Sequence, residues 1–258
     1  MNNIWTIAKK EIKSYFSSPI AYAVIFVFTA LIGFFFYSIM WWFNSQAIQM
    51  SQNPNYGQYY QQLNVNQMVY GPLFGNMSIV LLLTLPLLTM RLFSEEKKSG
   101  TEELLYTSPL SVWQILLGKY LASLIVLLTM LGLTGLLSVF TFSFGNPEPA
   151  PLLAGYLGIF LMGAAFIAVG IFFSSLTENQ IVSAILTFGA LLLFWVLNWA
   201  SSAAGGVAKS VLDYLSIFQH FEDFSKGIVD TTHLVYYLSF AFLGLFFTHS
   251  VIQSRRWR

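Results

Sequence analysis

Cysteine and charge are scarce in this sequence. None of the 258 residues is a cysteine, which excludes disulfide bonds, thiolate metal sites and a cysteine nucleophile. Only 9% of the residues are charged and 56% are hydrophobic, whereas about a quarter would be charged in a soluble domain. So little polar surface cannot cover a water-soluble globule, and the composition predicts an integral membrane protein. The net charge of +1 supplies no overall field for a nucleic acid.

Motifs for energy conversion and catalysis are also missing. Gly118–Lys119 does not form a P-loop, because Tyr120 follows the lysine and Trp113 stands where the first glycine is needed. Neither H-E-x-x-H nor G-x-S-x-G occurs. No predicted span has an ionisable residue near its middle, which argues against a proton-driven transporter, an intramembrane protease and a voltage sensor. We therefore expect no catalytic, cofactor-binding or metal-binding residue, and any driving force must come from a partner.

Six long apolar segments have the pattern of membrane-spanning helices. A helix needs about 20 apolar residues to cross a bilayer, and its backbone groups must be bonded within the segment. Strands are a poor alternative, because the runs are uniformly apolar rather than alternating. The predicted fold is all-α integral membrane, a single domain over residues 1–258 with spans at about 20–43, 73–90, 115–144, 151–173, 181–199 and 234–252.

Lysine and arginine are distributed unevenly around these spans. Ten lie in the two termini and in residues 91–119, whereas only Lys209 and Lys226 lie between the fifth and sixth spans. Because positively charged segments stay in the cytoplasm, we expect both termini there, in agreement with an even number of spans. Residues 174–180 then form a cytoplasmic turn, and the outer segments are 44–72, 145–150 and 200–233.

The N-terminal residues, about 2–17, have the pattern of an amphipathic helix. Ile4, Trp5, Ala8, Ile12, Tyr15 and Phe16 recur on one side, and Lys9, Lys10 and Lys13 lie largely on the other. Aromatic residues opposite lysines favour a helix that lies in the membrane interface. A solvated basic extension is the alternative. Ser17-Ser18-Pro19 is expected to end this helix and to open the first span.

A charged segment, residues 91–114, follows 77 residues without Asp, Glu, Lys or Arg. Ser99-Gly100-Thr101-Glu102 matches a capping box that would open a short helix through Tyr106, and Ser111-Val-Trp-Gln114 would open the third span. The pairs Glu95–Glu96 and Glu102–Glu103 imply no pocket, so we expect a solvated docking surface rather than an acid–base pair.

Two outer segments carry polar residues without a clear motif. Residues 44–72 contain five Asn, seven Gln and no charge, which fits a polar loop surface or, alternatively, a sugar- or peptide-contacting surface. Residues 200–233 contain acidic residues and two histidines, but their spacing matches no standard metal-ligand pattern. We considered as ligands Asp213, His220, Glu222, Asp223, Asp230 and His233.

The sequence resembles the permease subunits of type-2 ABC exporters, and within them the gliding-motility-associated permeases and their bacterial relatives. The most specific stretch is Met90-Arg-Leu-Phe-Ser-Glu-Glu-Lys-Lys-Ser-Gly-Thr-Glu-Glu-Leu-Leu105, followed by Leu117-Gly-Lys119. Phe16–Tyr22, Ser174–Ile181 and Phe221–Asp230 also fit, and the resemblance covers essentially the whole chain.

The resemblance implies roles for these segments. Residues 2–17 would be the elbow helix, with Trp5, Lys9, Lys10 and Lys13 at the interface. Glu96 to Thr107 would be the coupling helix on a separate ATPase subunit, and the loop 200–233 would form part of an external gate. The ATPase contacts would be Glu95, Glu96, Lys97, Lys98, Gly100, Thr101, Glu102, Glu103, Leu104, Leu105, Glu178 and Asn179.

The same resemblance implies partners and a location. ATP and Mg²⁺ would bind the ATPase subunit, with no cofactor on this chain. A second permease copy or a homologous permease, membrane lipid and an auxiliary outer-side protein are the other implied partners, in the bacterial inner membrane. The favoured function is the permease of an ATP-driven exporter. The alternatives are a complex with a mechanical or scaffolding role, and a self-sufficient channel or membrane enzyme.

Overall fold

The structure, a computed structural model, describes residues 2–52, 64–102, 109–144, 147–203 and 205–256. Within these residues it is helical throughout, without a strand, as the sequence predicted. The elements are α1 (Asn2–Ser17), α2 (Pro19–Gln52), the π-helical turn η2 (Asn66–Tyr70), α4 (Gly71–Thr89), α5 (Arg91–Lys98), α7 (Val112–Phe144), α8 (Pro149–Leu176), α9 (Gln180–Ala203), α10 (Gly206–Leu215), α11 (Ile217–Ser225) and α12 (Thr231–Arg256).

Six candidate membrane spans lie among the described residues, and each covers one of the six predicted segments, the third to within one residue. All are longer than predicted. The 34 residues of α2 extend about 51 Å at 1.5 Å per residue, against a hydrocarbon core of about 30 Å. This helix therefore continues into the predicted polar loop 44–72 as far as Gln52, and the chain is helical again from Asn66. Segment 200–233 is likewise largely helical, because it contains α10 and α11.

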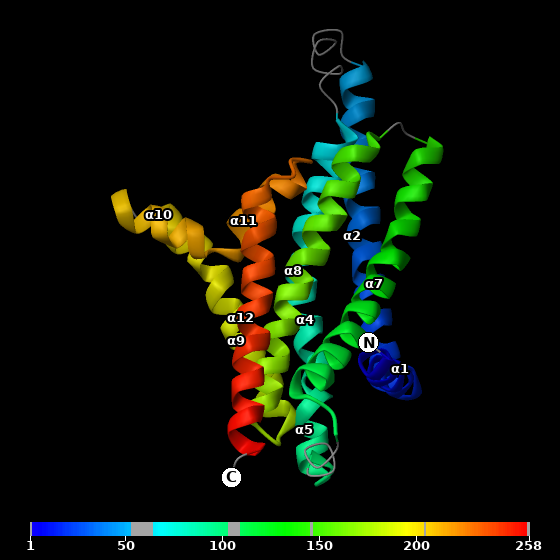
Figure 1. The fold of residues 1–258 in the computed structure, drawn as a ribbon. Coiled ribbons are helices and arrows are strands. Elements are labelled where there is room, and N and C mark those ends of the chain that lie inside the picture. The colour runs from blue at the N-terminus through cyan, green and yellow to red at the C-terminus, as the bar shows by residue number, and fades with distance from the viewer. Residues whose placement is uncertain (1, 53–63, 103–108, 145–146, 204, 257–258) are drawn as a thin grey trace.

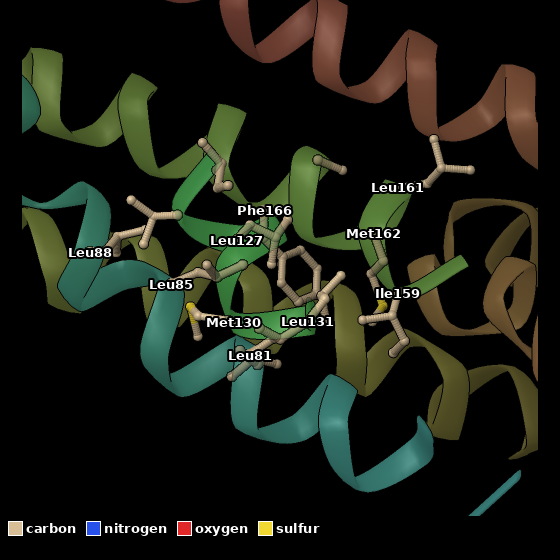
Figure 2. Close-up of a cluster of buried hydrophobic side chains, with 14 of the residues drawn as sticks. Leu81, Leu85, Leu88, Leu127, Met130, Leu131, Ile159, Leu161, Met162 and Phe166 are labelled. Atoms are coloured by element: carbon tan, nitrogen blue, oxygen red, sulfur yellow. The ribbon is translucent and has the colours of Figure 1, made fainter. Parts of the chain in front are cut away.

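Helix α8 lies at the centre of the bundle and packs against α4, α7, α9, α11 and α12 (Figure 1). Its sequence is rich in glycine and alanine, and small residues let neighbouring helices approach closely without a hydrophobic driving force in lipid. Figure 2 shows one layer of this packing, where Phe166 and Met162 of α8 lie between leucines of α4 and α7. Phe166 and Met162 are fully buried.

Two helices leave the bundle direction (Figure 1). Helix α1 lies across the base of α7, on the side of the bundle away from α12, and α10 extends sideways from α9. We call the end that holds α1, α5 and the α8–α9 turn the charged end, and the end that holds α10 and α11 the opposite end. Ser17–Pro19 separates α1 from α2 where the sequence predicted.

Helix α11 approaches α8 so closely at Gly158 that a larger residue should not fit there. A Cβ atom at Gly158 would lie 2.5 Å from Cβ of Phe224, which is not the flexible end of a side chain. We expect Gly158→Ala to cost about 1–3 kcal/mol through overpacking. Gly132→Ala on α7, where a Cβ meets nothing within 4 Å, is the matched control and should cost nothing. Thermal unfolding in detergent measures both; equal midpoints would contradict this packing.

Candidate functional site

Two lysines and two glutamates form a ring of ion pairs at the charged end. Lys119 Nζ on α7 lies 2.7 Å from Glu96 Oε1 on α5 and 3.2 Å from Glu11 Oε1 on α1. Lys10 Nζ closes the ring, at 3.2 Å from Glu11 Oε1 and 3.7 Å from Glu96 Oε1. The charges therefore alternate and sum to zero. We call these four residues the charge ring, and it joins three helices that are separate in the sequence.

The inner part of the charge ring is shielded from solvent. The Lys119 side chain is 2% exposed, and its ammonium group also donates to Leu92 O at 2.7 Å. Burial disfavours the charged form of Glu11, but Lys119 and Lys10 outweigh it and lower the pKa of this carboxyl below its ordinary value. For Lys10, burial likewise works against the charge, while Glu11 and Glu96 together raise its pKa. Both groups therefore hold their charges in the folded protein.

Helix α1 docks on α7 through close packing beside the ring. A Cβ at Gly118 would lie 2.6 Å from Cγ2 of Ile7 and 3.1 Å from the carbonyl oxygen of Ile4, so only glycine lets α1 lie this close. Tyr15 is buried, and its hydroxyl donates to Leu88 O (3.2 Å) and lies 3.1 Å from Ser123 Oγ. Arg91 stands over the Tyr15 ring at 4.6 Å from its centroid. The position of α1 is thus fixed by α4, α5 and α7 together.

Helix α5 is also tied to the end of α8. The Ser174 hydroxyl accepts from the N–H groups of Phe93 (3.0 Å) and Ser94 (3.2 Å) and donates to Met90 O (2.9 Å). The Ser94 hydroxyl donates to Ser174 O at 3.1 Å. Lys97, which is buried, donates to Ser175 O. A movement of α5 therefore carries the end of α8 with it.

Exposed polar residues lie beyond these buried contacts. Lys98 at the end of α5 lines a hollow of about 520 Å³ together with Glu178 and Asn179 from the α8–α9 turn. The structure thus brings together two segments that the sequence placed 80 residues apart. Asn179 also caps α9, because its Oδ1 accepts from the N–H groups of Ile181 (3.0 Å) and Val182 (3.4 Å). The Asn179 side chain is therefore exposed and also stabilises the start of α9.

One of the two predicted capping boxes is confirmed. Ser111 N–H donates to Gln114 Oε1 (3.1 Å), and Gln114 N–H donates to Ser111 Oγ (3.2 Å), directly before α7. Ser99 ends α5, because its N–H donates to Glu95 O at 3.0 Å and its hydroxyl donates to the same oxygen at 2.8 Å. Gly100 follows with a φ of +70°. Glu102, the last residue of the other predicted box, is helical. Most of the predicted helix through Tyr106 lies outside the described residues.

The predicted contact residues fall into three groups. Exposed are Glu95, Lys98, Gly100, Thr101, Glu178 and Asn179, with Glu102 half-buried. Glu103, Leu104 and Leu105 lie outside the described residues. The expectation of a solvated surface is wrong for Glu96 and Lys97, because the structure turns both toward the bundle, where Lys119 and Ser175 O bind them. On α1, Trp5, Lys9, Lys10 and Lys13 are exposed, whereas Ala8, Glu11 and Tyr15 face the bundle.

Glu11 and Lys119 are the functional residues that sequence reasoning missed. Glu11 follows Ala8 and precedes Tyr15 at helical spacing, which places a carboxylate inside the apolar face of α1. Lys119 lies four residues inside the predicted third span. Glu11 is the lone acid on an apolar helix face, and Lys119 is the lone base in a predicted span, so the two are candidates for an ion pair. This complementarity could have indicated the pair from the sequence.

Comparison with known families agrees with this architecture. Residues 42–219 match the ABC-2 family transporter proteins, which is more than half of the chain. The chain belongs to the ABC-2 transporter family. With six spans, it is a multi-pass membrane protein. The ABC-2 match includes Glu96 and Lys119 and begins after α1. No curated protein matches the chain.

The ABC-2 family also bears on the expected chemistry. Its permeases are membrane components that are not themselves catalytic, and they generally work with an ABC ATPase subunit and often dimerise. In this ABC-2 protein the four charges of the charge ring pair with one another and connect α1, α5 and α7.

Removing the buried lysine tests the charge ring. Lys119→Met removes the buried partner of Glu11 and Glu96 and leaves them only the exposed Lys10, and breaking a buried ion pair in this way costs about 3–5 kcal/mol. The matched control is Lys226→Met, whose pair with Glu222 is about half-exposed and should change stability by about 1 kcal/mol or less. Thermal unfolding in detergent measures both. Adding Glu11→Gln and Glu96→Gln to Lys119→Met should recover part of the loss; no recovery would contradict the ring.

The lowered pKa of Glu11 makes a pH prediction. Its contribution to stability is complete above the pKa of the unfolded carboxyl and is lost as pH falls through the lower pKa of the folded state. The stability difference between the unsubstituted protein and Glu11→Gln should therefore shrink on acidification. Unfolding midpoints measured from neutral to acid pH check this, with exposed Glu95→Gln as a control. A difference that stays constant or grows in acid would count against it.

Proposed function

We propose that this protein is the permease subunit of an ATP-driven ABC exporter, and that its charged end is the docking site of the ATPase. The observation that carries the proposal is the division of residues 91–102 and 174–179 into two layers. Glu95, Lys98 and Glu178 are exposed, while Glu96, Lys97 and Ser174 immediately behind them are bonded into the bundle. The outer layer is available for contact with a partner, and the inner layer is bonded to three helices. This arrangement suits the transfer of a movement from the partner to the bundle.

The partner in this proposal supplies ATP and Mg²⁺ binding, and this chain supplies the membrane path. Mixed charges at the outer layer, with acidic Glu95 and Glu178 beside basic Lys98, favour a partner of complementary pattern. Such patterns set register and partner choice more than affinity. The predicted contacts at residues 103–105 would extend this surface.

Two routes lead from the docking surface into the bundle. Glu96 connects α5 to Lys119 on α7 and, through Glu11, to α1. Lys97 and Ser94 connect α5 to the end of α8, which contacts α4, α7, α9, α11 and α12. A displacement of α5 by ATP-driven closure would then change the packing of the whole bundle. Such coupling requires that the partner bind one arrangement better than the other.

Orientation and assembly complete the proposal. The excess of lysine and arginine at the charged end supports a cytoplasmic location for this end and for both termini, which is where an ATPase has access to ATP. The exposed, lysine-bearing face of α1 then lies in the membrane interface as an elbow helix. A second permease copy or a homologous permease completes the transport path in the inner membrane, and segment 200–233 forms part of its outer gate.

Charge reversal of the outer layer tests ATPase docking. The triple variant Glu95→Lys, Lys98→Glu, Glu178→Lys should reduce co-purification of the cognate ABC ATPase by about tenfold or more, because three contacts become repulsive. The matched control reverses exposed charges at the opposite end, Lys209→Glu and Glu222→Lys, and should leave co-purification unchanged.

Glu96→Gln tests transmission separately from docking. It removes the anion that faces Lys119 but leaves the outer layer intact, so we expect normal co-purification and a loss of the permease-dependent stimulation of ATP hydrolysis. Unchanged co-purification of the triple variant would contradict docking at this end. Full stimulation with Glu96→Gln would contradict transmission through the charge ring.

A further inference from the structure

Two histidines at the opposite end of the bundle form a chain of contacts between α10, α11 and α12. Tyr214 O lies 3.0 Å from His220 Nε2, His220 Nδ1 lies 2.7 Å from His233 Nδ1, and His233 Nε2 lies 2.8 Å from Asp223 Oδ2. Both ends of this chain, a carbonyl and a carboxylate, are acceptors. His220 is buried, and its ring stacks on Tyr236 with centroids 3.8 Å apart.

Counting hydrogens shows which protonation state this geometry fits. Three contacts need three protons, because each N···O or N···N distance is that of a hydrogen bond. Two neutral imidazoles with an ionised Asp223 carry only two, so one contact would set two lone pairs against each other. With four protons, both Nδ1 atoms would carry a hydrogen, and the two N–H groups would point at each other. Three protons fill every contact, and the set of two imidazoles and one carboxylate is then neutral overall.

We propose that His220, His233 and Asp223 form a binding site for one extra proton, which clamps α11 and the end of α10 to the start of α12. We call these residues the proton clamp. The proposal is independent of ATPase docking, because it concerns the other end of the molecule. Losing the third proton, or gaining a fourth, removes one hydrogen bond from the chain and loosens the three helices.

The surroundings supply few competing charges. Helix α10 has the titratable residues Lys209, Asp213 and Tyr214. Besides the clamp histidines, α11 has Glu222 and Asp223. Near the clamp, α12 has Tyr236 and Tyr237. Lys226 and Asp230 lie in the connection between α11 and α12, and Lys226 pairs with Glu222. Among the other helices packed on α11, α4 and α9 have no titratable residue, and α8 has only Tyr156, which contacts Ser138. Asp230 is exposed and also interacts electrostatically with His233, whereas Asp223 is the anion in hydrogen-bond contact with it and compensates the extra proton directly.

The clamp also positions the wall of a groove. Tyr214 and Tyr236 pack around the His220 ring, with centroid distances of 5.7 Å and 3.8 Å, and both line a hollow of about 580 Å³ between α9, α10 and α12. Releasing His220 would free both tyrosines. Burial lowers the pKa of His220 and so opposes a second positive charge beside a protonated His233. The clamp therefore loosens in two directions. At higher pH it loses the third proton, and at lower pH it gains the fourth.

Histidine NMR on the full chain in detergent tests the proton count. The imidazole signals of His220 and His233 should change in two separated pH steps, as coupled sites do. Asp223→Asn should move the upper step to lower pH by at least one unit, while the neighbouring Asp213→Asn should not move it. Independent single-step titration of His220 and His233, or an upper step unaffected by Asp223→Asn, would overturn the proposal.

Thiol labelling tests the clamp without relying on the titration itself, and the absence of cysteine makes each introduced thiol unique. Ile217 on α11 is 1% exposed. The labelling rate of Ile217→Cys, divided by that of exposed Thr231→Cys, should be lowest between the two pH steps and rise several-fold beyond each. In a His233→Gln background the ratio should be independent of pH over this range. A ratio that is flat in the unsubstituted background, or varies equally in both, would overturn the clamp.

Discussion

A lysine ammonium group leaves water only where oxygen atoms replace its hydration, and Lys119 has three such oxygens, on Glu11, Glu96 and Leu92. Moving an ion out of water costs several kcal/mol, so the three contacts must be present together. That requirement fixes α1 against α7 and fixes the orientation of α5. The apolar faces of these helices allow many relative positions, because lipid does not favour one apolar contact over another. The charge ring selects one of them.

Helix α8 extends this local constraint through the molecule. Near its C-terminal end, Ser174 and Ser175 bind α5, and near its other end Gly158 lies against Phe224 of α11. Between these points its small residues bring neighbouring backbones close, so that the helix has little room to move independently. In the proposed coupling, a shift at α5 would therefore reach α11 by displacement of one rigid helix. This route needs no ionisable group within the membrane, in keeping with the lack of such groups near the middle of the spans.

The six spans were predictable because hydropathy depends only on local composition, and their order and type agree with the structure. Helix ends were less predictable: α2 continues through polar Asn44–Gln52, since a helix satisfies its own backbone in water as well as in lipid. The site was predicted in outline, at residues 91–114 and 174–180. Its inner layer was not, because the direction of Glu96 and Lys97 depends on Lys119 and Ser175, which lie far away in the sequence. The two histidines were noticed, but their 13-residue separation matched no ligand pattern.

The two ends of the molecule use different chemistry for the same purpose of joining helices. Lysine and carboxylate ionise far from neutral pH, so the charge ring keeps its charges near neutral pH, which suits the coupling role that we propose for it. Imidazole ionises near neutral pH, so a joint built on His220 and His233 depends on its surroundings. If α8 couples the ends, the proton content of the proton clamp sets how readily α10–α12 yield to a displacement that starts at α5. A change of pH near neutrality would then alter how far the displacement of α5 spreads at the opposite end, and it would leave the charge ring unchanged.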